Sequence, residues 1–247
     1  MSGGRRSVRS HMNKRGINLG CGKVILPCQR PAHHRMIPEW LYTDSTIAWD
    51  NADRNALPGV NLVIDLFDYP WRANDGALLP DNAYDYAIAS HIIEHIPHHI
   101  VCNGEFVAHH PIWQDGWFAW FSELYRIMKP GGEVWLIAPF AWSNSGVSDP
   151  THTRYITLAT FGYLKSPEGD NSPFEYRQQG HWEFDFEHDF WYSPHEDLAR
   201  EINLKMRQLF DDDAQLDDAL FQRAVNRASL SRLNVIVELC VHMRAVK

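Results

Sequence analysis

This chain of 247 residues has few cysteines, no long apolar run and no excess of positive charge. The cysteines are Cys21, Cys28, Cys102 and Cys240. They have neither CxxC spacing nor the density of a disulfide scaffold, so reduced thiols are expected. No stretch approaches the roughly eighteen apolar residues of a membrane helix, and the N-terminus lacks the apolar core of a signal peptide. These absences predict no membrane association and, by default, a cytoplasmic location.

The formal net charge of −8 bears on the class of partner. A protein that neutralises many phosphates usually carries the opposite sign, so long nucleic acid is disfavoured, although residues 1–14 are basic. The apolar share of 45% and the charged share of 22% are ordinary for a soluble globular protein. Ten tryptophans, many after Asp115, predict either an aromatic-walled pocket or a bulky core.

The chain shows no internal repeat and no dividing linker. Residues 1–14 are basic, rich in Gly and Ser and without periodicity, which is typical of a disordered leader or an expression remnant. Residues 15–247 are expected to form a single domain, with an elaboration after about residue 140.

Short apolar segments alternate with helical ones over the first half. Strands are expected at residues 16–19, 40–44, 60–65, 84–89 and 133–138, and helices at 91–96 and 117–128. Lys129-Pro130-Gly131-Gly132 should end the second helix. This pattern predicts an α/β fold, a Rossmann-like, mainly parallel sheet with helices on both faces.

The second half gives a weaker pattern. A loop is expected at 149–154 and a short helix at 158–165, followed by a strand at 184–190. Helices are expected at 194–210, with Ser193 as the N-cap, and at 217–230. Residues 234–246 should form the last strand, which we expect to be antiparallel.

Asn18-Leu19-Gly20-Cys21-Gly22 follows the first strand and is the strongest candidate for a ligand site. Glycines let a ligand approach the backbone closely and tolerate positive φ. Asp44 follows Gly20 by 44 − 20 = 24 positions, near the roughly twenty-residue offset of an acid that binds ribose. Asp65 closes the third expected strand. The alternative is an ordinary turn with surface aspartates.

Only two glycines are present where the dinucleotide fingerprint GxGxxG has three. The third glycine helps the turn to approach a pyrophosphate. Its absence favours a nucleoside-type cofactor without a pyrophosphate over NAD.

The segments INLGCGK (17–23), WLYTD (40–44), VIDL (63–66), YDYAIASHIIEHI (84–96) and LYRIMKPGGEVWLIAP (124–139) occur in this order. In these landmarks the chain resembles the class I S-adenosylmethionine-dependent methyltransferases with a compact LGCG opening. The resemblance covers about half of the chain, and only the order and spacing together are specific. Residues 23–39 depart from it, because they make the path to the second strand longer than in many members.

The resemblance implies an S-adenosylmethionine cofactor and a role for each matching residue. Asn18, Gly20, Cys21 and Gly22 would meet its methionine and ribose portions. Asp44 would bind the ribose hydroxyls. The adenine would lie near Asp65 and Leu66. Past the fourth strand, Ser90 and His91 would line the face where methyl donor and acceptor meet.

A sulfonium methyl is already activated, so transfer needs alignment, exclusion of water and a base only if the acceptor must lose a proton. His91 and His152 are candidate bases, whereas His95 is expected to pack or hydrogen-bond. The DPTHTR segment at 149–154 should lie over the same end of the sheet, which favours His152 and Arg154 for acceptor contact. In the alternative, Arg154 is a loop latch paired with a carboxylate such as Asp149.

The fourteen histidines invite a metal interpretation. Adjacent pairs do not converge on one ion, and neither HExxH nor a Cys/His finger is present, so no metal is predicted. The rival functions are a nicotinamide-dependent oxidoreductase, a non-catalytic partner subunit with a cofactor fold and a nucleic-acid-binding module. The methyl acceptor is unidentified, with a small molecule or sugar slightly favoured, and the oligomeric state is left open.

Overall fold

The computed structural model describes residues 14–28, 37–107, 115–164, 183–185, 190–209, 218–229, 234 and 236–247. The expected leader, apart from Lys14, lies outside these residues. In the described part of the chain, no helix has both the length and the hydrophobicity needed to cross a bilayer.

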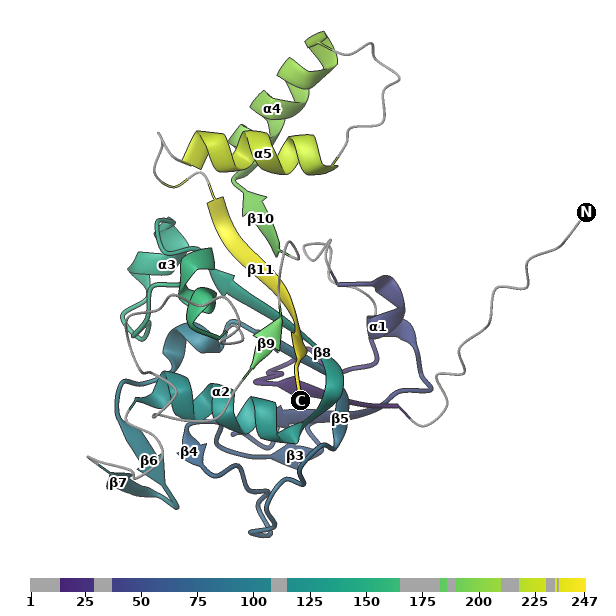
Figure 1. The fold of residues 1–247 in the computed structure, drawn as a ribbon, viewed down its shortest axis with the longest axis vertical. Coiled ribbons are helices and arrows are strands. Elements are labelled where there is room, and N and C mark those ends of the chain that lie inside the picture. The colour runs from purple at the N-terminus through teal and green to yellow at the C-terminus, as the bar shows by residue number, and fades with distance from the viewer. Residues whose placement is uncertain are drawn as a thin grey trace, which may run out of the picture.

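The main sheet has the order β10-β11-β8-β5-β1-β2-β3, and β9 pairs with β11 (Figure 1). Its strands are β1 (Arg15–Leu19), β2 (Ala48–Asp53), β3 (Leu62–Val63), β5 (Tyr84–Ser90), β8 (Met128–Pro139), β9 (Phe184–Asp185), β10 (Phe190–Pro194) and β11 (Ile236–Ala245). The pairs from β3 to β8 are parallel, and β11 is antiparallel to its neighbours. The predicted α/β class, the mainly parallel sheet and the antiparallel last strand are confirmed.

Side chains of β8 alternate between the two faces of the sheet, as the pleat requires. Val134, Leu136 and Ala138 belong to the core on one face, whereas Trp135 and Ile137 belong to the core on the other. Every residue of β5 but Ser90 is buried. A strand covered on both faces can be continuously apolar, which explains why this segment was recognisable from the sequence.

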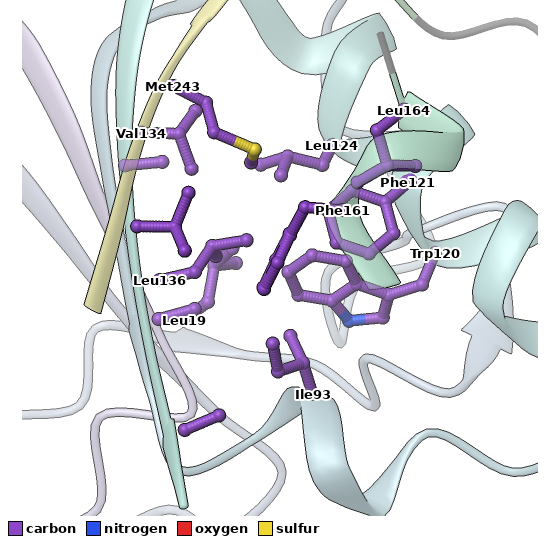
Figure 2. Packing of buried hydrophobic residues seen from close by; sticks show 14 of the residues in the cluster. Leu19, Ile93, Trp120, Phe121, Leu124, Val134, Leu136, Phe161, Leu164 and Met243 are labelled. Atoms are coloured by element: carbon purple, nitrogen blue, oxygen red, sulfur yellow. The ribbon is translucent and has the colours of Figure 1, made fainter. Parts of the chain in front are cut away.

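The larger core lies under α2 (Gly116–Ile127). Asp115 caps this helix by accepting a hydrogen bond from the Trp117 amide. Figure 2 shows how sheet residues such as Leu136 face Trp120 and Phe121 of the helix, with Phe161 and Leu164 of the 3₁₀ helix η2 (Leu158–Leu164) beside them. The predicted helix at 117–128 is confirmed, and it ends at Ile127, where β8 begins with Met128 and continues through the KPGG segment.

The opposite face of the sheet is covered by α1 (Glu39–Thr43). The prediction of a strand at 40–44 is therefore wrong. Leu41 and Tyr42 are adjacent buried residues at the sheet, and Pro38 precedes the helix at the position where a missing amide hydrogen is harmless. The second strand is instead β2, eight residues later than predicted at its start.

Smaller differences concern the elements after β2. The third strand is only Leu62–Val63, and residues 91–96 contain a 3₁₀ helix, η1 (Ile93–His95), where a helix was expected. The helix α3 (Asn144–Ser148) was not predicted. A second sheet of β4 (Asp68–Tyr69), β6 (Ile100–Cys102) and β7 (Glu105–Val107) was also missed.

Two helices, α4 (Glu196–Leu209) and α5 (Asp218–Ser229), connect β10 to β11. Ser193 does not cap α4, because it is still paired within β10, opposite Glu238 of β11. The predicted strand at 184–190 is present at β9 and at the start of β10, and residues 186–189 lie outside the described part. Since β10 ends and β11 begins at the carboxyl ends of the parallel strands, the helix pair stands on that edge (Figure 1).

Candidate functional site

The strand order reverses between β1 and β5: from β1 the chain continues to β2 and β3, and from β5 it continues to β8 on the other side. In open α/β sheets, ligands bind in the crevice outside the carboxyl ends at such a switch point. A cavity of about 470 Å³ lies there. It is lined by Gly20, Asp53, Arg54, Asn55, Ile64, Asp65, Leu66, Phe67, His91, Ile92, His95 and Thr151.

The glycine turn after β1 forms one wall. Gly20 and Gly22 have φ of +64° and +52°, which only glycine adopts without strain. A Cβ added to Gly20 would lie 2.2 Å from Cδ1 of Ile92, whereas one added to Gly22 would meet nothing within 4 Å. Between them, Cys21 is buried, and burial raises the pKa of its thiol to about 11. The turn therefore presents bare backbone and an unreactive thiol.

Asn18 supports this turn from beneath. Its Nδ2 donates to the Val24 carbonyl at 2.7 Å and to Oδ1 of Asn51 at 3.1 Å. The Asn51 side chain also bonds the amide and the carbonyl of Leu26. Both asparagines are buried, and Asn18 is not among the lining residues, so its observed role is to hold the segment after the turn.

Asp53 is the acid that closes the second strand. Its Oδ2 accepts the Gly22 amide at 3.0 Å, and its Oδ1 accepts the Asn55 amide at 2.8 Å. Asp44, predicted for this position, lies at the end of α1 and accepts hydrogen bonds from the amide and hydroxyl of Thr46. Asp44 does not line the cavity.

Asp65 and Leu66 lie where the sequence predicted, at the cavity wall after β3. Oδ1 of Asp65 accepts the Phe67 amide at 2.9 Å, and the Leu66 carbonyl accepts Nε1 of Trp71 at 3.0 Å. Leu66 is buried and Asp65 is exposed. The wall therefore combines an apolar surface with a fixed carboxylate.

Past β5, His91 has φ of +56° and its amide donates to the Ile137 carbonyl. Its Nε2 lies 2.9 Å from Oε1 of Glu238, and its Nδ1 lies 3.4 Å from Oε1 of Glu94. These carboxylates, Glu238 first, raise the pKa of His91 to about 9, so the ring is a cation at neutral pH. That state is unsuited to a general base. Ser90 ends β5 opposite Ile137 and is not among the lining residues.

The loop at 149–154 is fastened to η1 by backbone bonds. The amides of Thr153 and Arg154 both donate to the Glu94 carbonyl, at 2.9 and 3.1 Å. The Thr153 hydroxyl donates to the Ile96 carbonyl at 2.7 Å. The expectation that this loop lies over the carboxyl end of the sheet is confirmed.

Arg154 acts as a latch for this loop, but its partner is not the Asp149 considered from the sequence. Its guanidinium donates to the carbonyls of Ile96 and Pro97 and forms an ion pair with Asp115 at 2.6 Å. It also lines a second hollow of about 670 Å³ with Trp117, Phe118, Tyr155 and Tyr163, among others. Acceptor contact by Arg154 stays a prediction.

Three potential metal ligands meet beside the first cavity. One donor atom from each of Glu94, His95 and His152 lies within 4.8 Å of the other two. The two imidazole rings are edge-to-face, with centroids 4.9 Å apart. The sequence argument excluded neighbouring histidines as joint ligands, but here the loop brings His152 to a histidine from another element.

No family model and no curated protein matches the chain. Among solved structures, it is similar to a SAM-dependent methyltransferase from Archaeoglobus fulgidus, with 16% identity, 94% of this chain and 86% of the other covered, and a TM-score of 0.47. It is also similar to an S-adenosylmethionine-dependent methyltransferase from Mesorhizobium loti, with 12% identity, 93% and 90% covered, and a TM-score of 0.42. A third is phosphoethanolamine N-methyltransferase 2 of Haemonchus contortus, in complex with S-adenosyl-L-methionine, with 12% identity, 96% and 49% covered, and a TM-score of 0.37.

Sequence reasoning missed Asp53 and underrated Glu94 and His95. The signal for Asp53 was an acid at the end of AWDNAD, a segment that forms a strand although half of its residues are polar. The signal for the other two was the spacing HxxEH directly after a buried strand. The pairing of that segment with residue 152 depends on tertiary structure and has no local signal.

Proposed function

We propose that this protein is an S-adenosylmethionine-dependent methyltransferase whose cofactor binds in the cavity at the carboxyl ends of β1, β2 and β3. The observation that supports this most directly is that Gly20, Asp53 and the pair Asp65–Leu66 all line this cavity. Each of the three lies at the carboxyl end of a different parallel strand. A nucleoside needs a hydroxyl acceptor, an apolar surface for its base and bare backbone for close approach, and this cavity offers all three.

Asp53 replaces Asp44 as the residue proposed to bind the ribose hydroxyls. Its Oδ1 accepts both the backbone amide and the side-chain amide of Asn55. Among the described residues, its Oδ2 accepts only the Gly22 amide and so keeps capacity for a ribose hydroxyl. Ile64 and Leu66, which line the cavity, provide the surface proposed for the adenine, and the backbone of Gly20 is the wall proposed for the methionine portion.

When bound, the cofactor supplies a methyl group on a sulfonium, which needs no further activation by the protein. The residues of the chain then have to align the acceptor and exclude water. His91 and His95 lie on the cavity wall next to the loop at 149–154, and this is the side proposed for the acceptor. His91, held as a cation between Glu238 and Glu94, is proposed to position groups there and not to remove a proton.

Calorimetric titration with S-adenosylmethionine and S-adenosylhomocysteine tests the proposal. Wild-type protein should bind both at micromolar strength. Asp53→Ala should weaken binding by roughly 10- to 100-fold, the usual effect of removing a charged hydrogen-bond partner. Asp44→Ala, the matched control, should bind like the wild type because Asp44 does not line the cavity.

Clear heat with NAD and none with either sulfur compound would favour the oxidoreductase and reject the proposal. Equal losses in Asp44→Ala and Asp53→Ala would remove Asp53 from its proposed role.

A further inference from the structure

Glu94 in η1 has a buried side chain that the fold alone does not explain. It is 1% exposed, and neither carboxylate oxygen has a hydrogen-bond partner among the described residues. A buried carboxylate that accepts no hydrogen bond destabilises the fold. The main-chain carbonyl of the same residue is fully used by Thr153 and Arg154. A metal ion bound directly to the carboxylate would supply the missing partner, which the ion pair with His91 at 3.4 Å does only in part.

Two imidazoles beside it are held in the tautomer that a metal ligand requires. Nδ1 of His95 lies 3.2 Å from the Thr151 carbonyl, and Nδ1 of His152 lies 3.1 Å from the Gly146 carbonyl. A carbonyl oxygen only accepts, so each Nδ1 carries the proton and each Nε2 keeps a lone pair. A backbone carbonyl that orients a histidine in this way is the usual outer partner of a metal-bound imidazole.

We propose that Glu94, His95 and His152 bind a divalent transition-metal ion of the Zn²⁺, Co²⁺ or Mn²⁺ type. Two imidazoles and one carboxylate are a ligand set that such ions prefer to Mg²⁺ or Ca²⁺. Bonds of about 2.0–2.1 Å place tetrahedral donors roughly 3.3 Å apart. The donor atoms now lie within 4.8 Å of one another, so closing the site takes side-chain movements of about 1 Å.

His91 compensates the charge of Glu94 only in part. Its Nδ1 forms an ion pair with Oε1 of Glu94 at 3.4 Å, while its Nε2 is the closer contact, at 2.9 Å from Glu238. Neither oxygen of Glu94 has a hydrogen-bond partner among the described residues.

The proposed ion would lie at the cavity wall, because His95 and Thr151 line the cavity. Three protein ligands leave coordination positions open for water or substrate. We assign these positions to an oxygen of the methyl acceptor, which makes a hydroxyl-bearing acceptor the favoured class. This assignment, unlike the metal site itself, rests on the proposed function.

Metal binding is tested with chelator-treated full-length protein, Zn²⁺ in calorimetry and Co²⁺ in visible absorption spectroscopy. Wild type should bind one Zn²⁺ per chain and give a Co²⁺ spectrum typical of nitrogen and oxygen ligands. Glu94→Gln and His152→Asn should each weaken Zn²⁺ binding by on the order of 100-fold, since losing only an outer partner of a ligand costs 10- to 100-fold. His195→Asn is the matched control: His195 is exposed at the start of α4, where asparagine also suits a helix cap.

Absence of stoichiometric Zn²⁺ binding by the wild type would overturn the metal site. So would unchanged binding in both cluster variants, because the zinc would then be on other histidines. Far-UV circular dichroism verifies that each variant is folded. S-adenosylhomocysteine titrations on the same samples separate the two proposals. If the wild type binds Zn²⁺ but not S-adenosylhomocysteine, the proposed function is rejected and the metal site is retained.

Discussion

Gly20 is the residue at which the cavity wall and the core meet most tightly. Its φ of +64° already disfavours a side chain, and the Cβ position lies 2.2 Å from Ile92. We therefore expect Gly20→Ala to lower the free energy of unfolding by about 2–4 kcal/mol, since left-handed backbone strain and overpacking add. Urea denaturation measures this change.

Gly22→Ala is the matched control, because its φ is also positive and its Cβ would enter open space. It should lose only about 1 kcal/mol, the backbone contribution alone. Equal losses for the two variants would show that contact with Ile92 does not matter. Because a substitution at Gly20 changes the stability of the fold, it cannot serve as a test of ligand binding alone.

Asp44 and Asp53 show the limit of reading single residues from the sequence. An acid at the end of the second strand was predicted, and the structure has one, but nine positions later. WLYTD resembles a strand because it is largely apolar. AWDNAD forms a strand although it is polar, because its Asn51 is buried and hydrogen-bonded to Asn18. In the sequence, an asparagine buried against a hydrogen-bonding partner looks the same as an asparagine in a surface loop, because the partner is distant along the chain.

At the scale of elements, the loop at 149–154 depends on Arg154. Its guanidinium holds two backbone carbonyls and Asp115, the N-cap of α2. Arg154→Ala should therefore lower the free energy of unfolding by about 2–4 kcal/mol, because buried polar groups lose their partner. Urea denaturation without any ligand measures the loss.

Arg200→Ala provides the comparison, since the ion pairs of Arg200 with described residues are exposed and lie within α4. It should change the free energy of unfolding by less than about 1 kcal/mol. If Arg154→Ala were as stable as Arg200→Ala, Arg154 would not be the latch, and a direct role in acceptor binding would gain weight.

Element types were predictable where one physical rule dominated. β5 and α2 followed from continuous burial and from helical spacing, respectively. η1, α3 and the β4–β6–β7 sheet are short, and short elements depend on tertiary contacts more than on local preference. The same limit applied to the donors of the proposed metal site, which come from two separate segments.

For the molecule as a whole, Asp85 ties three strands together at the edge opposite the cavity. Its carboxylate accepts hydrogen bonds from Lys14 at 2.7 Å, Lys129 at 2.6 Å and the Arg15 amide at 3.0 Å. Burial raises the pKa of this carboxyl, but the two ammonium groups and the amide outweigh it, and the net pKa is below its usual value of 3.8.

A lowered pKa in the folded state means that Asp85 stabilises the fold above its unfolded pKa and loses this effect as pH falls through the folded value. Asp85→Asn should cost roughly 1–2 kcal/mol at pH 7, and the deficit should shrink below about pH 4. Urea titrations of both proteins between neutral and acidic pH measure it. A deficit that stays constant into the acidic range would contradict the assignment.

The global topology was easier to predict than the site it creates. Alternation of strands and helices implied a mainly parallel sheet, and the observed strand order has a switch point between β1 and β5, where open α/β sheets place their crevice. Which acid, which histidine and which loop reach that crevice depended on the unpredicted helix α1 and on the bonds between η1 and residues 153–154.

Lys14 and Lys247 lie at the same edge of the sheet. Lys14 contacts Asp85 near the start of β5, and Lys247 donates to Asn82 and to the Met128 carbonyl, where β8 begins. The cavity opens at the other edge. A resin, a fluorophore or a fused protein attached at either of these lysines would leave the mouth of the cavity facing away from the attachment. The chain is thus suited to surface-immobilised binding measurements with Lys14 or Lys247 as the anchor.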